Sequence, residues 1–207
     1  MTLPAAAATD GGAAKPHGRK VQILDEAIRL LGEHGFNGAT VQALARRCGI
    51  TNAGLLYYFG SKDALLLEVL DEYETRERRV ITPLVKAIEA ARADADTTWG
   101  AILAMMRGIV ARFVERPDLA RFLFVVQAEA LDRTHPAHQW FRERDARTIE
   151  LFASVLEGFV VDPESTARRA LSGMQGLAQH WLRQEASFDL AAEWDALAAL
   201  VIVRDTR

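Results

Sequence analysis

Apolar residues recur at helical spacing along almost the whole chain, and this pattern restricts the fold more than any other feature. Val21, Leu24, Ile28 and Leu31 follow one another at steps of three, four and three residues, which places them on one face of a helix. This stripe ends at Gly35, a residue type that favours helix termination. The sequence shows neither the alternation typical of a strand nor an internal repeat of fixed period. It therefore predicts an all-α fold.

Two short helices are predicted directly after this stripe. Thr40 is suited to cap a helix over residues 41–48, which Gly49 closes. Thr51 is suited to cap a second helix over residues 52–58. Threonine hydroxyls accept hydrogen bonds from the free N–H groups of a first helical turn, and glycine commonly follows a helix end. The segment therefore reads as two short helices joined by a tight turn.

A longer helix and then a bundle are predicted for the rest of the chain. Gly60 ends the second short helix, and Ser61 caps a helix that runs to about Val80. Prolines occur near the first turn of several later helices, where a missing N–H costs nothing. The further helices are expected at roughly 83–94, 97–115, 117–131, 136–160, 163–183 and 189–203.

Composition restricts the class of protein. The 207 residues are 50% hydrophobic and 26% charged, which is ordinary for a protein with a substantial core. The single cysteine excludes an intramolecular disulfide framework and is typical of a reducing cytoplasm. No apolar run approaches the about 18 residues of a membrane-spanning helix. We therefore expect a cytoplasmic protein without a membrane span.

Charge is distributed unevenly along the chain. Residues 1–62 contain seven Lys or Arg and four acidic residues, a net charge of +3, whereas residues 63–207 carry −6. A basic N-terminal third on an acidic body predicts a polyanionic partner for the first part only. Residues 1–17 lack the basic start and apolar centre of a signal peptide, and we expect them to form a disordered basic arm.

The two short helices and their turn, "TVQALARRC", "GIT" and "NAGLLYYF", have the form of a helix-turn-helix. Its second helix would present its N-terminal residues to the major groove. There Asn52 is suited to paired hydrogen bonds with a base edge, and Thr51 to a base or a phosphate. Ala53 and Gly54 are small enough for close approach. The residues expected to face the shared core are Val41, Leu44, Ala45, Ile50, Leu55 and Phe59.

Phosphate contacts are predicted around this second helix. Tyr57, Tyr58 and Lys62 would place donors on the DNA backbone, as would Thr40 and Gln42 at the start of the preceding helix. Short helices with glycine turns also occur in helical proteins without a DNA role, and paired tyrosines are often half-buried packing residues. Further salt-sensitive contacts are expected from the basic residues of the arm, Lys15, Arg19 and Lys20.

Residues 23–70, "ILDEAIRLLGEHGFNGATVQALARRCGITNAGLLYYFGSKDALLLEVL", resemble the DNA-binding domain of TetR-family transcriptional regulators. The resemblance lies in the order of the Gly-aromatic helix end, the capping threonine, Ala-x-x-x-Gly, the reading helix and Phe-x-Ser-Lys-x-x-Leu. Leu56 stands where the family most often has tyrosine, Tyr58 where histidine is common, and Cys48 replaces a small residue. Which of Tyr57 and Tyr58 contacts phosphate is therefore left open. The resemblance implies a DNA-binding domain over 18–62 and a sensing and dimerisation domain over 63–207.

A homodimer interface is expected on two of the late helices, because the resemblance implies a dimerising C-terminal domain. Gly173 and Gly176 would let a partner backbone come near, and two helices from each subunit would form a four-helix interface. The alternative is that both apolar stripes belong to the intramolecular core. The predicted interface residues are Ile149, Phe152, Leu156 and Phe159 on one stripe, and Ala170, Met174, Leu177 and Trp181 on the other.

A small-molecule pocket is implied for the middle of the chain, which is rich in large and adaptable side chains. Pockets are commonly built from such residues with a few polar groups. The alternative for each residue is an ordinary place in the core. The candidates are Trp99, Met105, Met106, Phe113, Phe122, Phe124, Gln127 and Trp140.

The histidines offer the strongest candidate for a metal site. His135 and His138 lie three residues apart with Asp132 nearby, but spacing fixes no third or fourth ligand. We expect surface or capping roles for these two, and a packing or interface role for His180. No metal and no cofactor is predicted. An enzyme is not expected either, since no nucleophile–base pair can be assembled from the sequence.

The pattern as a whole predicts a ligand-responsive, sequence-specific DNA-binding transcriptional regulator. Its expected form is a homodimeric repressor on a palindromic double-stranded DNA operator. A small-molecule effector among the central helices would move the helix from Ser61 to Val80 and release the DNA. The alternative is a helical small-molecule-binding or partner-interaction protein that has lost its DNA role; Asn52, Lys62 and the basic N-terminal part argue against it.

Overall fold

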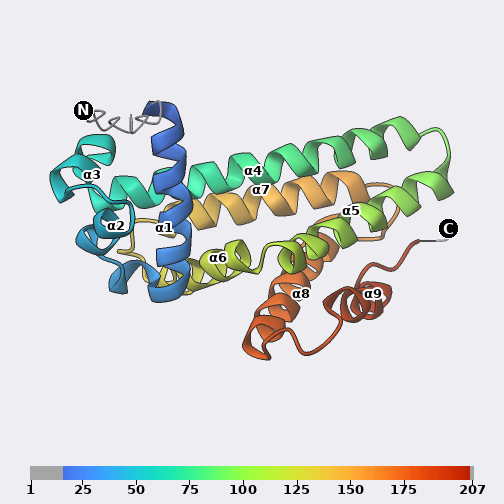
Figure 1. Cartoon of the computed structure of the whole chain (residues 1–207). Helices are drawn as coiled ribbons and strands as arrows, with labels where there is room; N and C mark the ends of the chain where they lie inside the picture. The colour runs from blue at the N-terminus through green and yellow to red at the C-terminus, as the bar shows by residue number, and fades with distance from the viewer. Residues whose placement is uncertain (1–15, 206–207) are drawn as a thin grey trace, which may run out of the picture.

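The computed structural model describes residues 16–205 and has, over this range, nine helices and no strand (Figure 1). The predicted all-α fold is therefore confirmed. In chain order the helices are α1 (Pro16–Gly38), α2 (Val41–Arg47), α3 (Asn52–Phe59), α4 (Lys62–Ala91), α5 (Ala95–Glu115), α6 (Pro117–Glu129), α7 (His138–Leu156), α8 (Pro163–Arg183) and α9 (Leu190–Val201).

Helices α1, α2 and α3 gather at one end of the molecule, around the first turns of α4 (Figure 1). Their amphipathic faces meet there, and burial of the apolar side chains stabilises the cluster. Leu44 and Leu55 are at most 2% exposed, and Phe59 is 5% exposed. All six residues predicted to face this core are buried or partly buried against it: Val41, Leu44, Ala45, Ile50, Leu55 and Phe59.

Helix α4 is longer than the sequence predicted. It runs without interruption from Lys62 to Ala91 and contains Pro83 in its interior, so the expected end near Val80 and the separate helix over 83–94 are wrong. Proline usually breaks a helix, because it removes one hydrogen bond and crowds the preceding turn. Here Leu84, Val85 and Ile88 pack against the core beyond the proline, and this packing holds the helix together.

Helix α1 departs from regular geometry at Gly35, where the sequence predicted its end. Gly35 has φ 69° and ψ 178°, which kinks the helix, and helical backbone resumes beyond it as far as Gly38. This conformation is essentially restricted to glycine. The short turn after Gly35 leads into Thr40, which caps α2.

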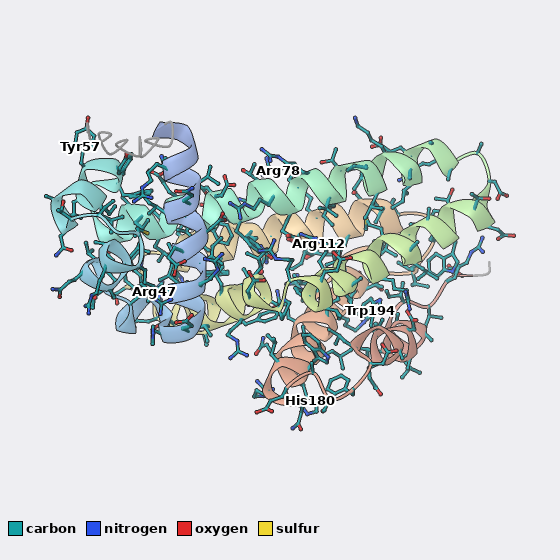
Figure 2. All side chains as sticks on the ribbon, in the orientation of Figure 1. Arg47, Tyr57, Arg78, Arg112, His180 and Trp194 are labelled. Carbon is teal, nitrogen blue, oxygen red and sulfur yellow. The ribbon has the colours of Figure 1, made fainter. Side chains whose placement is uncertain are left out.

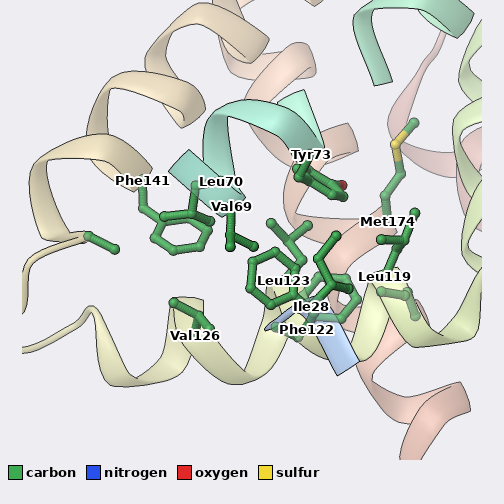
Figure 3. Close-up of a cluster of buried hydrophobic side chains, with 14 of the residues drawn as sticks. Ile28, Val69, Leu70, Tyr73, Leu119, Phe122, Leu123, Val126, Phe141 and Met174 are labelled. Atoms are coloured by element: carbon green, nitrogen blue, oxygen red, sulfur yellow. The ribbon is translucent and has the colours of Figure 1, made fainter. Parts of the chain in front are cut away.

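The remaining helices form a bundle around α4. Helix α4 packs on α5 and α7, α7 packs on α8, and α9 packs on α5 and α8. Helix α6 packs on α1 and so joins the bundle to the helix-turn-helix end. Figure 3 shows part of the continuous core, where Ile28, Leu70, Phe122 and Met174 bring together α1, α4, α6 and α8.

The structure describes only the end of the predicted arm, and the predicted domain boundary falls inside a helix. Residues 1–15 of the arm lie outside the described residues, and Arg19 and Lys20 belong to α1. The predicted boundary after Lys62 falls in the first turn of α4, so this helix is common to both parts of the chain. In the part of the chain that the structure describes, no helix is long and apolar enough to cross a membrane.

Candidate DNA-binding face and ligand pocket

Two threonine caps and one glycine turn build the helix-turn-helix. The Oγ1 of Thr40 accepts a hydrogen bond from the Ala43 N–H at 3.0 Å, and the Oγ1 of Thr51 accepts from the Gly54 N–H at 3.0 Å. Gly49 lies between the helices with φ 64°, which glycine adopts without a Cβ penalty. Because both hydroxyl oxygens act as acceptors here, their hydrogens remain available for donation to a partner.

The first turn of α3 is open to solvent. Thr51, Asn52 and Ala53 are exposed, and Gly54 is half-buried. An exposed amide on the first turn of a reading helix is placed to reach base edges in a major groove. The structure therefore brings together the four residues that were predicted to face the bases.

The two adjacent tyrosines have different surroundings. Tyr57 is 88% exposed, and its ring points away from the molecule at the outer side of α3 (Figure 2). Tyr58 is half-buried and packs against the core, with its ring centroid 6.2 Å from that of Phe59. The Tyr57 hydroxyl is therefore freer to reach a partner, a difference that the sequence could not supply.

Three further predicted phosphate contacts lie near the starts of α2 and α4. Thr40 and Gln42 are exposed, whereas Lys62 is half-buried. The Nζ of Lys62 lies 4.3 Å from the centroid of the Phe36 ring, a cation–π contact. This contact holds the Lys62 side chain against the end of α1.

The basic residues of α1 are tied to neighbouring helices. The Nη2 of Arg19 donates to the backbone carbonyl of Cys48 at 2.5 Å. The Nζ of Lys20 lies 2.5 Å from Glu68 Oε2. These contacts fasten α1 to the end of α2 and to α4, so both residues position the helix-turn-helix.

A cavity of about 470 Å³ lies in the bundle along α4, within the size range of small-molecule pockets. Helices α4, α5, α7 and α8 form most of its walls, and α6 contributes Leu123. Its apolar walls are formed by Ile81, Val85, Ile109, Phe113, Leu123, Leu151, Phe152, Leu171 and Met174.

Ion pairs fasten the helices around this cavity. The Nη2 of Arg147 on α7 lies 2.9 Å from Glu74 Oε2 on α4, and Arg78 Nη2 lies 2.8 Å from Glu74 Oε1. The Nη2 of Arg112 on α5 lies 3.1 Å from Glu77 Oε1 (Figure 2 labels Arg78 and Arg112). The carboxylates of Glu74 and Glu77 are thus already engaged by arginines.

Most residues predicted to bind ligand lie elsewhere. Of the eight candidates, Phe113 lines the cavity. Met105, Met106 and Phe122 are 0% exposed in the core, and Phe124 is also buried. The other three make separate contacts: Trp99 stacks on Phe159 at 6.0 Å, Gln127 donates to Gln175 at 3.4 Å, and Trp140 donates to Asp71 at 3.0 Å.

The sequence analysis missed the cavity wall formed by α4. Tyr73, Glu77, Ile81 and Val85 all line the cavity, and their four-residue spacing places them on one helical face. This spacing was visible in the sequence, but the expected helix end near Val80 divided the face in two. A helix continued through the proline would have revealed it.

The predicted dimer residues are mostly covered by their own chain. Leu156, Ala170 and Trp181 are buried, and Phe152 and Met174 are buried at the wall of the cavity. Ile149, Phe159 and Leu177 are half-buried. The last three therefore keep some surface available to a second subunit.

The histidines take part in local contacts. The Nδ1 of His135 accepts from the Ala137 N–H at 3.2 Å, and burial lowers the pKa of His135 below its ordinary value. The Nδ1 of His138 lies 2.8 Å from the Ala130 carbonyl oxygen, while His180 is exposed and lies beside Phe188. Among the described residues, no group of three or more His, Cys, Asp or Glu side chains is arranged to hold a metal.

The last residue of α6 is bonded directly to the end of α1. The Oε2 of Glu129 accepts from the Phe36 N–H at 2.5 Å, and its Oε1 accepts from the Asn37 N–H at 3.1 Å. A Cβ added to Gly35 would lie 2.6 Å from Glu129 Oε1, so glycine permits this approach. The His135 ring packs edge-on against Phe36 at 5.0 Å. This junction joins the bundle to the helix-turn-helix.

Comparison with known proteins gives one consistent picture. The family described as "Bacterial regulatory proteins, tetR family" matches residues 23–69. The HTH-type transcriptional regulator BetI of Paraburkholderia phytofirmans is 26% identical over 199 residues, covering 90% of each chain.

Solved structures share the fold. The transcriptional regulator FadR of Bacillus subtilis, solved with stearoyl-CoA, has a TM-score of 0.69 at 16% identity and covers 88% of this chain and 97% of its own. NalD of Pseudomonas aeruginosa, the secondary repressor of the MexAB-OprM multidrug efflux pump, has a TM-score of 0.67 at 18% identity. The match covers 90% of this chain and 94% of the NalD chain.

Proposed function

We propose that the chain is a member of the TetR family of bacterial regulatory proteins and that it acts as a ligand-responsive, homodimeric transcriptional repressor. It occupies a palindromic double-stranded DNA operator in the cytoplasm and leaves it when a small-molecule effector binds. The observation that carries the proposal is the exposed first turn of α3 in the same chain as a cavity of about 470 Å³. The curated relatives of the chain are transcriptional regulators rather than enzymes.

The DNA contacts divide into reading and positioning. Asn52 reads a base edge, with Thr51 beside it, and the small residues Ala53 and Gly54 permit the close approach. The exposed position of this turn supports the assignment. Positioning contacts to phosphates, which fix the register on the duplex, are assigned to Thr40, Gln42, Tyr57, Tyr58 and Lys62.

Helix α4 couples the cavity to the DNA. It begins at Lys62, beside the reading helix, and lines the cavity from Tyr73 onward. The contact of Glu129 with the end of α1 supplies a second connection. A ligand that binds better to a released conformation shifts the protein toward it, and only by that difference in affinity. In the released conformation the two reading helices no longer match their half-sites.

The dimer interface is assigned to exposed parts of the last helices. A Cβ at Gly176 would meet no atom within 4 Å, and Leu177 beside it is half-buried. On α9, which packs on α8, Leu200 is 77% exposed. A second copy that covers these residues would remove apolar surface from water, and it would double the number of bases that are read.

Selection from random double-stranded DNA with the purified protein, followed by gel shift, tests the proposal. Asn52→Ala should relax base preference, whereas Lys62→Ala should weaken binding to all sequences and reduce its salt dependence. Lys86→Ala is the matched control, because Lys86 is an exposed lysine near the far end of the same helix. Failure to enrich a palindrome, or unchanged binding in both variants, would favour the alternative of a helical small-molecule-binding or partner-interaction protein without a DNA role.

A further inference from the structure

We infer that the cavity along α4 binds a ligand with an apolar body and a single carboxylate, and that the Arg144 guanidinium and the Tyr73 hydroxyl hold this carboxylate at the inner end. The inference rests on the proposed function, because the carboxylate ligand would be the effector. It names the chemical class of that effector from the residues of this chain alone.

Arg144 differs from the other arginines that line the cavity. Arg78 and Arg147 each lie within 2.9 Å of a Glu74 carboxylate oxygen. The side chain of Arg144 is 18% exposed, and its Nη1 is buried without a hydrogen-bond partner. A guanidinium offers five N–H donors, and leaving such groups buried and unpaired is costly. Among the arginines of the lining, Arg144 is therefore the one without a carboxylate oxygen at hydrogen-bond distance.

Asp145 is the carboxylate that forms an ion pair with Arg144, but the pair has no hydrogen bond. Asp145 Oδ1 lies 3.8 Å from Arg144 Nη1, too far for a hydrogen bond, and this oxygen also has no hydrogen-bond partner. Asp145 does not line the cavity. Burial raises the pKa of the Asp145 carboxyl, and this effect exceeds the opposing influence of Arg144. A ligand carboxylate in the cavity would supply the bidentate geometry that arginine prefers.

Tyr73 provides a second donor at the same place. Its ring centroid lies 5.8 Å from the Arg144 Cζ, and the side chain is 4% exposed. Figure 3 shows Tyr73 at the end of the buried cluster that faces Met174, another residue of the cavity wall. Burial raises the pKa of Tyr73, so its hydroxyl keeps its proton near neutral pH. The oxygen of a protonated phenol can accept from the Arg144 guanidinium, while its hydrogen donates to a ligand carboxylate.

The rest of the cavity suits an apolar body. The lining residues of α4 extend from Tyr73 to Glu89, about 24 Å at the helical rise of 1.5 Å per residue. Ile81, Val85 and Phe113 border the space between these ends. An elongated apolar group would bury its surface there, while the carboxylate stays at the inner end.

A cationic ligand finds less support. The carboxylates of Glu74 and Glu77 are taken by Arg147, Arg78 and Arg112. Glu89 is exposed and lies at the end of the lining opposite Tyr73. At the Tyr73 end of the described lining, the carboxylates are therefore neutralised by arginines, whereas the Arg144 guanidinium has no hydrogen-bonded carboxylate.

Isothermal titration of the full-length dimer with three probes of equal chain length tests the inference. The probes are dodecanoate, dodecan-1-ol and dodecyltrimethylammonium, each kept below its aggregation concentration. Wild-type protein should bind dodecanoate about 10- to 100-fold more tightly than the alcohol, as expected for hydrogen bonds to a charged group. 2-Naphthoate is added as a second carboxylate, so that a flat body is distinguished from a linear one.

Variants test whether Arg144 causes the preference for dodecanoate over dodecan-1-ol. Arg144→Gln should reduce dodecanoate binding to the level of the alcohol while alcohol binding persists, which shows that the cavity is intact. Arg142→Gln is the matched control, because Arg142 is an exposed arginine of the same helix that does not line the cavity; it should keep the preference. If Arg144→Gln loses both ligands, Arg144→Lys decides: its ammonium should still favour dodecanoate over the alcohol, by a smaller factor because lysine cannot bind the carboxylate in a bidentate way. Equal binding of the two ligands by Arg144→Lys would overturn the inference.

Equal binding of the alcohol and dodecanoate by wild type, tightest binding of the ammonium probe, or full preference in Arg144→Gln would each overturn the inference. The proposed function is judged separately, by operator selection without ligand. If the protein selects a DNA sequence but shows no preference for a carboxylate, the proposed function is retained and the inference is rejected. If it prefers a carboxylate but selects no DNA sequence, the cavity assignment is retained and the proposed function is rejected.

Discussion

Removal of the Glu129 carboxylate should loosen the connection between the bundle and the helix-turn-helix. Glu129→Ala deletes two charge-assisted bonds, to the Phe36 N–H at 2.5 Å and to the Asn37 N–H at 3.1 Å. Bonds of this kind contribute about 1.5–3 kcal/mol each when buried. Asn37 is exposed, so water replaces the second bond at little cost. We therefore expect the free energy of unfolding to fall by about 1–3 kcal/mol in total.

Urea unfolding, followed by circular dichroism, measures this loss, and Glu150→Ala, an exposed glutamate on α7, serves as control. Gly35→Ala should also destabilise, by about 1–3 kcal/mol from its backbone conformation alone, and further from the overlap with Glu129. In the double variant the overlap is gone while the backbone strain remains, so its cost should be smaller than the sum of the single costs. A Glu129→Ala protein as stable as the Glu150→Ala control, or strictly additive costs, would refute this account of the junction.

Three shorter predictions follow from the same structure. In gel shifts, Tyr57→Phe should weaken operator binding more than Tyr58→Phe, because Tyr57 is 88% exposed and Tyr58 is half-buried; the reverse order would reassign the phosphate contact. Since burial lowers the pKa of His135, the unfolded chain takes up a proton at higher pH than the folded chain does, and stability should fall as the pH drops through about 6.5. Urea unfolding at about pH 7.5 and about pH 5.5 should show a smaller loss for His135→Asn, which keeps an acceptor for the Ala137 N–H but does not titrate. Gly176→Arg should shift the protein from dimer to monomer in light scattering, and a persistent dimer would place the interface elsewhere.

The sequence predicts the helix-turn-helix well because that part of the fold depends on local interactions. The hydroxyls of Thr40, Thr51 and Ser61 cap their helices as expected. Each cap joins residues three positions apart, so the pattern that encodes it is short and readable. Gly49 likewise follows from a local requirement for a positive φ.

The cavity and the junction are harder to predict because they depend on contacts between distant residues. Glu129 accepts a hydrogen bond from a residue 93 positions earlier. The sequence around either residue contains no pattern that predicts this contact. Pro83 has the local signature of a helix break, yet packing on both sides keeps α4 continuous. Large side chains such as Met105 and Phe122 are equally suited to a core or a pocket wall, and only the packing of the whole chain assigns them to the core.

In the proposed homodimer, two cavities share the free energy that releases the DNA. Moving a two-state equilibrium from about 99:1 to about 1:99 requires a differential affinity of about 5.5 kcal/mol. Two symmetric cavities share this requirement, so each must favour the released state by about 2.8 kcal/mol, or about 100-fold. One charged group in bidentate hydrogen bonding provides a contribution of this size, about 1.5–3 kcal/mol. The carboxylate contact proposed for Arg144, which is half-buried and has no hydrogen-bonded carboxylate, is therefore large enough to drive the switch when it forms fully only in the released conformation.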